Sequence, residues 1–176
     1  IFAEGKYHWY GQAFQAKGID KISEGGAATM VGVVMYESED LLNWKYEGVI
    51  LAVSEDENSE LRAPMRFERP KIIYNEKTKQ YVLWCHYVGY PGAHGTTPGT
   101  AEAGVAVCDK VNGKYKWLGT TRPLDGKFVR DNTLYKCEDG TAYYIYDRHA
   151  IEDGKEDRCL YAVKLSDDYL SCTDEY

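Results

Sequence analysis

The amino-acid sequence predicts an all-β protein. Three observations lead to this expectation: apolar and aromatic residues recur with a two-residue period, Gly, Asn and Asp mark frequent turns, and the chain holds 16 Tyr, 4 Trp and 4 Phe. Tyrosine suits strands because its ring packs on a pleated sheet while its hydroxyl keeps a polar partner. No stretch longer than about ten residues has the spacing of an amphipathic helix.

Five short segments carry the strongest strand signal. Each is rich in β-branched or aromatic residues, and each is bounded by turn-forming residues. In chain order these segments are residues 7–10, 32–36, 80–85, 104–107 and 143–146.

Two patterns recur in step along the chain. The first is a turn followed by an aromatic strand, which begins at Tyr7, Tyr81 and Tyr143. The second is an apolar strand that runs into Ser or Cys, acidic residues and then an aromatic residue. It is found at Ser38, Cys108 and Ser166. Both patterns return after roughly 60–70 residues, so one supersecondary unit is used about three times.

A unit of this length that holds about four strands has the size of a β-propeller blade. The units are expected over residues 1–51, 52–121 and 122–176, approximately. Because natural propellers have about 4–8 blades, three do not close a ring, and we expect a fragment of a larger domain. The opening at Ile1 rather than Met agrees with a processed or trimmed chain. A meander or sandwich with chance similarity between its parts is the alternative.

Composition excludes several classes of function. The chain has 28 acidic and 21 basic residues and a net charge of -7, which argues against nucleic-acid binding. No apolar run approaches the ~20 residues of a membrane-spanning helix. The five cysteines are odd in number, irregularly spaced and without a CxxC pair, so we expect small buried hydrophobes rather than disulfides or a zinc site.

Two carboxylates are the candidate catalytic residues. Glu68 and Asp131 each precede a short apolar strand, and each is expected to open the first strand of a blade and to face one mouth of the channel. Paired carboxylates in one cleft are what glycosidic-bond hydrolysis needs. The alternative is that each forms a structural ion pair with its neighbour, Arg69 or Arg130.

Other segments have weaker signals. His86 directly follows an aromatic strand and is either a ligand contact or a hydrogen-bonded structural residue. The turn-rich segment 89–99, with Tyr90 and His94, is either a mouth loop that contacts ligand or a surface loop without function. The acidic segment 54–60 is expected to be a solvated loop, although its oxygens could weakly hold calcium. No cofactor, phosphate-binding loop, nucleophile elbow or metal-ligand cluster is expected.

Five ordered motifs resemble those of glycoside hydrolase family 43, nearest the branch of exo-β-1,3-galactanases and related galactosidases. The motifs cover residues 5–11, 68–75, 103–107, 130–134 and 165–170. The resemblance implies a five-bladed β-propeller, of which this chain would supply roughly the first three blades. It also implies inversion at the anomeric centre and an exo-acting site at one mouth of the channel.

The resemblance also assigns roles to individual residues. Glu68 would contact sugar and organise the catalytic carboxyl groups, while Asp131 would tune the general acid and hold sugar hydroxyls, with Arg130 supporting it. Gln12 stands where relatives commonly have glutamate. The general acid would be a glutamate beyond Tyr176. The expected substrate-binding residues are Gln12, Tyr10, Arg69, His86, Tyr90 and Arg130, with His94 as an alternative to Tyr90.

These expectations together predict an inverting exo-glycosidase for galactan or arabinogalactan side chains. The alternatives are an arabinofuranosidase or xylosidase of the same family, a non-catalytic sugar-binding propeller, and a propeller that binds protein on its rim. The expected partners are an oligo- or polysaccharide and the remaining blades of the same protein, without nucleic acid or membrane. Because bacterial relatives are mostly exported, the resemblance implies a secreted or periplasmic location.

Overall fold

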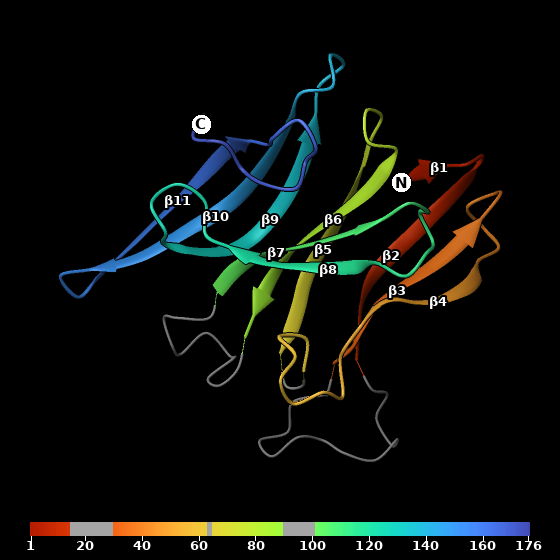
Figure 1. The fold of residues 1–176 in the computed structure, drawn as a ribbon, viewed down its shortest axis with the longest axis horizontal. Helices are drawn as coiled ribbons and strands as arrows, with labels where there is room; N and C mark the ends of the chain where they lie inside the picture. Colours follow the sequence, from red (N-terminus) through yellow and green to blue (C-terminus); the bar gives the residue numbers. More distant parts are fainter. Residues whose placement is uncertain (15–29, 63–64, 90–100) are drawn as a thin grey trace.

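The regular structure of the protein is β-strand. The computed structural model describes residues 1–14, 30–62, 65–89 and 101–176, and in these ranges eleven strands form three antiparallel sheets (Figure 1). The prediction of an all-β protein is therefore confirmed. No helix in the described ranges is long and apolar enough to cross a membrane.

The sheets follow one another along the chain, and we number them accordingly. Sheet 1 has the strand order β1 (Phe2–Ala3), β2 (Lys6–Phe14), β3 (Met30–Ser38), β4 (Lys45–Ala52). Sheet 2 has the order β5 (Arg66–Asn75), β6 (Gln80–Val88), β7 (Ala101–Cys108), β8 (Lys116–Thr121). Sheet 3 has the order β9 (Phe128–Lys136), β10 (Ala142–Glu152), β11 (Lys155–Lys164).

A tight turn precedes each of the three aromatic strands. A positive φ at Gly5 (80°), Lys79 (60°) and Gly140 (86°) reverses the chain before β2, β6 and β10. In the second turn, Asn75 Oδ1 also accepts a hydrogen bond from the backbone N–H of Thr78 (3.1 Å). The first recurring pattern of the sequence therefore corresponds to three turns of different length that share a residue of positive φ shortly before the aromatic strand.

The second recurring pattern is a turn closed by a serine and an aspartate. Ser38 Oγ donates to Asp40 Oδ1 (3.1 Å), and Ser166 Oγ donates to Asp168 Oδ1 (2.6 Å). The residue after each aspartate has a positive φ, 64° in the first turn and 63° in the second. Sheets 1 and 3 therefore turn back after equivalent strands with almost identical geometry.

Sheet 2 is buried on both faces. Alternate residues of β6 point in opposite directions, as the two-residue period of a strand requires. Tyr81, Leu83 and Cys85 belong to the core between sheets 1 and 2. Val82 and Trp84 belong to the core between sheets 2 and 3. The three sheets are therefore joined by two apolar layers, with sheet 2 in the middle.

Trp84 is the largest fully buried side chain in the second of these cores. Its indole Nε1 donates a hydrogen bond to the backbone oxygen of Tyr169 (2.9 Å), and its ring centroid lies 4.7 Å from that of Tyr144. The hydrogen bond satisfies the one polar group of the buried indole, so Trp84 ties the centre of sheet 2 to the segment that follows β11.

All five cysteines are free thiols. Cys85 is fully buried, in keeping with the expectation of a small hydrophobe, and burial raises the pKa of its thiol. Cys159 lies exposed on β11, so for that residue the expectation was wrong. The reason is that β11 is an edge strand with no further described strand beside it.

Aromatic side chains line the face of sheet 1 that points away from sheet 2. Trp9, Tyr36 and Tyr46 stand opposite one another on β2, β3 and β4, with ring centroids 5.4 and 5.2 Å apart. Trp44 joins them, its centroid 5.9 Å from that of Trp9. We call these four residues the aromatic face. Trp9 is 61% exposed and Tyr46 is 53% exposed, so much of this surface is open to water.

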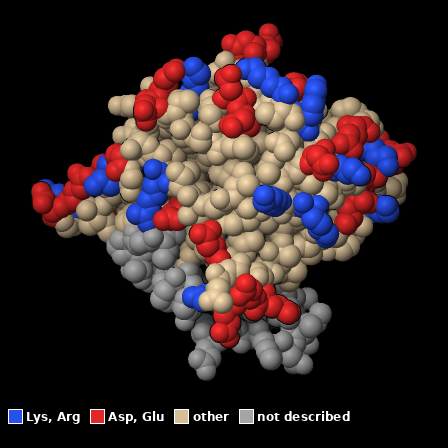
Figure 2. Space-filling model, in the orientation of Figure 1, with Lys and Arg blue, Asp and Glu red and all other residues tan. Residues whose placement is uncertain are grey.

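Charged side chains are mixed in sign over the surface. On the face seen in Figure 2, acidic and basic groups are interspersed, with uncharged surface between them. Several of them form ion pairs between strands or sheets, such as Lys6 with Glu37 (2.5 Å) and Lys136 with Glu76 (2.5 Å). Because such exposed pairs contribute little, the two apolar layers carry most of the stability.

We predict that Trp84→Phe lowers the free energy of unfolding of the chain by about 2–4 kcal/mol. The substitution removes buried ring volume and leaves the Tyr169 carbonyl without its donor. Urea denaturation measures the change, and Trp9→Phe on the aromatic face is the matched control, expected to cost about 0.5 kcal/mol or less. Equal effects of the two substitutions would contradict the assignment of Trp84 as the anchor of the second core.

Candidate active site

The strand β5 carries a bulge at Arg69 and Pro70. Glu68 pairs with His86 and Lys71 pairs with Trp84, so two residues of β5 stand opposite the single residue between these partners on β6. Arg69 has a φ of 51°, in the left-handed region that costs a non-glycine residue energy. Pro70 lies inside the strand, and the bulge tolerates it because no ladder donor is needed there.

The strand β9 carries a bulge at the corresponding place. Val129 pairs with Arg148 and Asn132 pairs with Tyr146, which leaves Arg130 and Asp131 as the inserted pair. Ile72 of β5 and Leu134 of β9 both face the preceding sheet, and counted back from these residues Asp131 corresponds to Arg69 and Arg130 to Glu68. The expectation that Glu68 and Asp131 occupy equivalent positions was therefore wrong. Glu68 directly precedes the two inserted residues of the β5 bulge, whereas Asp131 is the second inserted residue of the β9 bulge.

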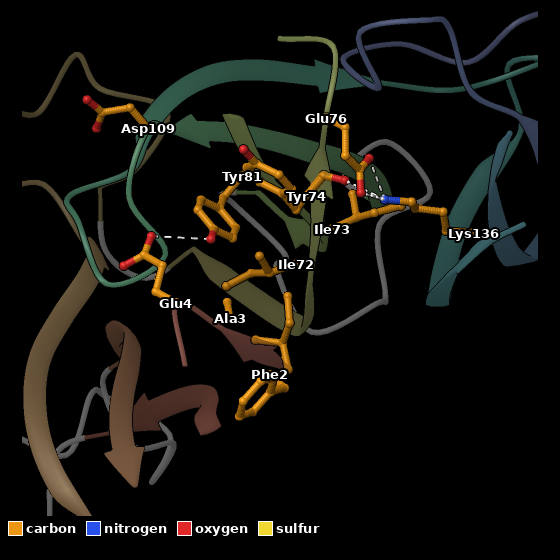
Figure 3. A pocket seen from close by; sticks show the side chains of 11 residues that line it. Phe2, Ala3, Glu4, Ile72, Ile73, Tyr74, Glu76, Tyr81, Asp109 and Lys136 are labelled. Atoms are coloured by element: carbon orange, nitrogen blue, oxygen red, sulfur yellow. Dashed lines mark hydrogen bonds and ion pairs between the residues drawn. The ribbon is translucent and has the colours of Figure 1, made fainter. Parts of the chain in front are cut away.

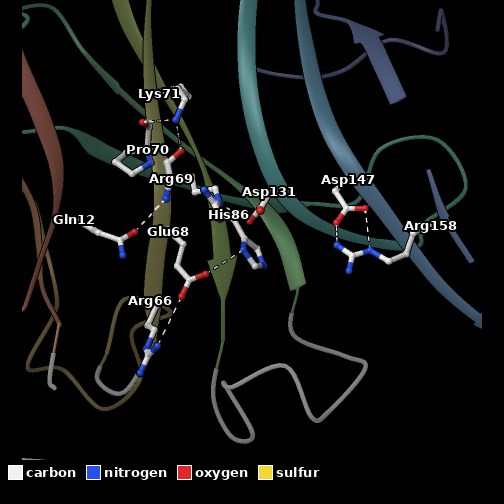
Figure 4. A network of polar contacts seen from close by, with 10 residues as sticks. All are labelled: Gln12, Arg66, Glu68, Arg69, Pro70, Lys71, His86, Asp131, Asp147 and Arg158. Carbon is white, nitrogen blue, oxygen red and sulfur yellow. Dashed lines mark hydrogen bonds and ion pairs between the residues drawn. The ribbon is translucent and has the colours of Figure 1, made fainter. Parts of the chain in front are cut away.

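Arg69 connects the two bulges and all three sheets (Figure 4). Its Nε donates to Asp131 Oδ1 on β9, and its backbone N–H donates to Gln12 Oε1 on β2 (3.2 Å). The Arg69 and Asp131 side chains remain 55% and 54% exposed, so the pair is accessible to a ligand. Asp131 therefore pairs with Arg69 of sheet 2 and not with its own neighbour, Arg130, which was the alternative.

Glu68 lies in a more enclosed position. Its Oε2 is 3.4 Å from His86 Nδ1, and its Oε1 is 3.7 Å from Arg66 Nη1. Interaction with His86 lowers the pKa of Glu68 although partial burial opposes the shift, and Arg66 and Arg69 lower it further. The carboxylate is therefore ionised at neutral pH and can accept hydrogen bonds from hydroxyl groups.

His86 supports Glu68 from β6. The histidine is 5% exposed, and its Nε2 has no hydrogen-bond partner among the described residues. Its proximity to Glu68 agrees with either interpretation of this histidine, because a structural support and a ligand contact would both lie here.

The other expected site residues have distinct surroundings. The backbone N–H of Ile72 donates to the Tyr10 hydroxyl (3.0 Å), so this phenol joins sheets 1 and 2, and burial raises its pKa. Arg130 Nε donates to His149 Nδ1 (2.8 Å) and thus points along sheet 3. Tyr90 and His94, with most of segment 89–99, lie outside the described residues.

Charged residues that the sequence did not single out surround this site. Asp147 on β10 forms an ion pair with Arg158 on β11, and Lys71 lies beside Arg69 and Asp131. Asp147 is the residue of β10 that stands opposite the β9 bulge. The high content of charged residues along 147–158 is the sequence signal that could have pointed to it.

Metal binding has little support in the described residues. There, no group of three or more His, Cys, Asp or Glu could hold a metal ion. In the acidic segment 54–60, Asp56 Oδ1 instead accepts a hydrogen bond from the backbone N–H of Asn58 (2.9 Å). The chemistry available at the bulges is therefore that of carboxylates, guanidinium groups and an imidazole.

A hollow lies along the other half of β5, away from the bulge (Figure 3). It has a volume of about 580 Å³ and is lined by residues 1–4, by Ile72–Tyr74 and by several charged side chains. Its polar groups are largely engaged with one another: Tyr81 Oη donates to Glu4 (3.3 Å), and Lys136 pairs with Glu76. The hollow and the bulges therefore hold separate clusters of paired polar groups along β5.

Comparison with known proteins identifies the family to which the chain belongs. It matches the sequence model described as glycosyl hydrolases family 43 over residues 4–176. It is similar to the solved structure of a GH43 β-1,3-galactosidase with galactodeoxynojirimycin, at 30% identity and a TM-score of 0.79, over 99% of this chain and 59% of that one. No curated protein sequence gives a significant match.

Two further solved structures of similar proteins share this fold. A second GH43 β-1,3-galactosidase is 29% identical (TM-score 0.76; 98% of this chain, 32% of that one). An exo-β-1,3-galactanase from Clostridium thermocellum is 26% identical (TM-score 0.73; 98% and 34%). The chain thus spans between about a third and three fifths of the proteins it resembles. A family model that matches nearly every residue, and solved members that share the arrangement of the sheets, establish that the protein belongs to glycoside hydrolase family 43.

Proposed function

We propose that these residues form three blades of a five-bladed propeller whose complete form is an inverting exo-glycosidase acting on β-1,3-linked galactan or arabinogalactan side chains. The observation that carries the proposal is the pair of carboxylates, Glu68 and Asp131, at one end of sheets 2 and 3: Arg69, which follows Glu68 in β5, forms an ion pair with Asp131. A sugar ring with several hydroxyl groups suits such a set of acceptors and donors.

The stacking of the sheets supports a larger ring. Sheets 2 and 3 each bury one face against the preceding sheet, and the equivalent face of sheet 1 is the aromatic face. On the other side, Tyr135 of β9 is 59% exposed. Two further blades between these surfaces would cover both, and the coverage of 59% of a related galactosidase agrees with three blades of five.

Within this proposal the two carboxylates support the chemistry rather than transfer the proton. Every described carboxyl group with a clear pKa shift is shifted downward, whereas a general acid needs a raised pKa. Glu68 would accept hydrogen bonds from sugar hydroxyls, and Asp131 would tune a general acid supplied by a glutamate of another blade. Water activated by a further group would then attack the opposite face of the sugar.

The substrate class comes from the relatives named above, which are β-1,3-galactosidases and an exo-β-1,3-galactanase. Other activities of the family, on arabinofuranosides or xylosides, would use the same acceptors, so substrate screening distinguishes them. A non-catalytic sugar-binding propeller is the second candidate, and Gln12 favours it, because an amide there replaces the carboxylate common in relatives.

We predict that Asp131→Asn in the complete polypeptide lowers kcat about 100-fold or more. The substitution removes the negative charge that Arg69 holds in place and that would tune the general acid. Hydrolysis of aryl β-galactosides and β-1,3-galactan, compared with aryl arabinosides and xylosides, measures the effect on the best substrate.

Asp153→Asn is the matched control for this experiment. Asp153 lies in the turn between β10 and β11 with a φ of 49°, a conformation that asparagine tolerates, and we expect unchanged activity. Unchanged activity in Asp131→Asn as well would remove Asp131 from the mechanism. Sugar binding without hydrolysis in the unmodified protein would favour the non-catalytic candidate.

We also predict a pH-dependent effect of Glu68→Gln on stability. Because the pKa of Glu68 is lowered in the folded state, the ionised carboxylate stabilises the fold above the ordinary pKa of glutamate, and this contribution disappears as pH falls through the lowered value. Glu68→Gln should therefore destabilise the protein at pH 7 and have a smaller effect at a pH below the ordinary pKa of glutamate, about 4.3. Urea denaturation at both pH values measures this, with exposed Glu55→Gln as control. A pH dependence no larger than that of the control would refute it.

A further inference from the structure

His149 on β10 is a buried histidine next to the β9 bulge. It is 5% exposed, and its Nδ1 accepts a hydrogen bond from Arg130 Nε (2.8 Å). Its Nε2 lies 2.9 Å from Glu156 Oε1 on β11. The ring of Phe128 meets it edge-on, with the centroids 5.8 Å apart. The imidazole is thus held by a hydrogen bond from β9 and lies against a carboxylate of β11, while Nε2 makes no hydrogen bond among the described residues.

These contacts determine the protonation state of the ring. An arginine Nε–H can only donate, so Nδ1 must carry a lone pair and the proton must reside on Nε2, facing the Glu156 carboxylate. A protonated ring would place an N–H on Nδ1 against the N–H of Arg130, with two positive charges in contact. The hydrogen bond therefore exists only while His149 is neutral.

Arg130 is one of the two residues inserted in the β9 bulge, and the other is Asp131. Arg69 holds Asp131 from sheet 2, and His149 holds Arg130 from within sheet 3. The bulge is fixed at both of its residues, by partners on different sheets. Movement of Arg130 would move the peptide that carries Asp131.

We propose that neutral His149 is a positioning residue for Asp131, acting through Arg130, so that its protonation releases the bulge and lowers activity on the acid side of the pH profile. The inference rests on the proposed function, since it assumes that Asp131 serves the reaction.

The electrostatic surroundings agree with this role. Burial lowers the pKa of His149, and the positive charges of Arg130 and Arg158 lower it further, while Glu156 and Asp147 oppose the shift. These groups come from each strand that packs beside the ring: Arg130 from β9, Asp147 from β10, and Glu156 and Arg158 from β11. The fold therefore keeps the ring neutral to a lower pH than an ordinary histidine.

The first test measures the contact without using activity. In the complete polypeptide labelled with ¹³C-histidine, an NMR titration follows each histidine separately, with and without Arg130→Gln. We expect the pKa of His149 to rise in Arg130→Gln, because a positive neighbour is removed, while the resonance of His8 on sheet 1 stays unchanged and is the internal control. An unchanged His149 pKa would overturn the proposed contact.

The second test separates positioning from mere packing. Asn at position 149 offers an amide oxygen in place of Nδ1 but cannot be protonated, whereas Ala offers no acceptor. His149→Ala should lower kcat about 10- to 100-fold with little change in KM. His149→Asn should stay close to the unmodified enzyme at neutral pH and should move the acid-side midpoint of kcat to lower pH.

Three results would overturn the proposal: normal activity in His149→Ala, equal loss in the Ala and Asn variants, or an unmoved acid-side midpoint in His149→Asn. Circular dichroism of each variant establishes that it is folded, and His149→Asn alone decides the question if His149→Ala does not fold. Failure of the proposed function is distinguishable, because it appears as unchanged activity in Asp131→Asn.

Discussion

Burial of sheet 2 on both faces is the constraint on which the rest of the structure depends. A strand with one apolar face can border water, but β6 sends alternate side chains into two separate cores and so requires a sheet on each side. This requirement places β5 and β9 in neighbouring layers. It therefore brings residues some sixty positions apart, such as Arg69 and Asp131, within bonding distance.

The site depends on two irregularities in an otherwise regular frame. The bulges of β5 and β9 turn Arg69 and Asp131 out of the ladder, and each costs backbone pairing or, at Arg69, an unfavourable φ. The cost is offset by contacts that hold the bulges, from Gln12 on sheet 1 and His149 on sheet 3. Strain at one end of well-packed sheets is a common way to present polar groups to a ligand.

The sequence predicted the elements better than the site because strands and tight turns are local features. The two-residue period and the turns before Tyr7, Tyr81 and Tyr143 depend on neighbouring residues, and they were confirmed. The bulges could not be predicted, since an inserted residue alters pairing with a distant strand and leaves no local pattern. For the same reason Glu68 and Asp131 were wrongly placed in equivalent positions, and the contact of His149 with Arg130 was missed.

The aromatic face has a consequence for folding during synthesis on the ribosome. In the proposed ring, the last blade would cover the surface formed by Trp9, Tyr36, Trp44 and Tyr46. During synthesis this apolar surface would therefore stay exposed to water until the whole ring had left the ribosome. At roughly 5–20 residues per second this delay lasts many seconds, long enough for contacts between nascent chains.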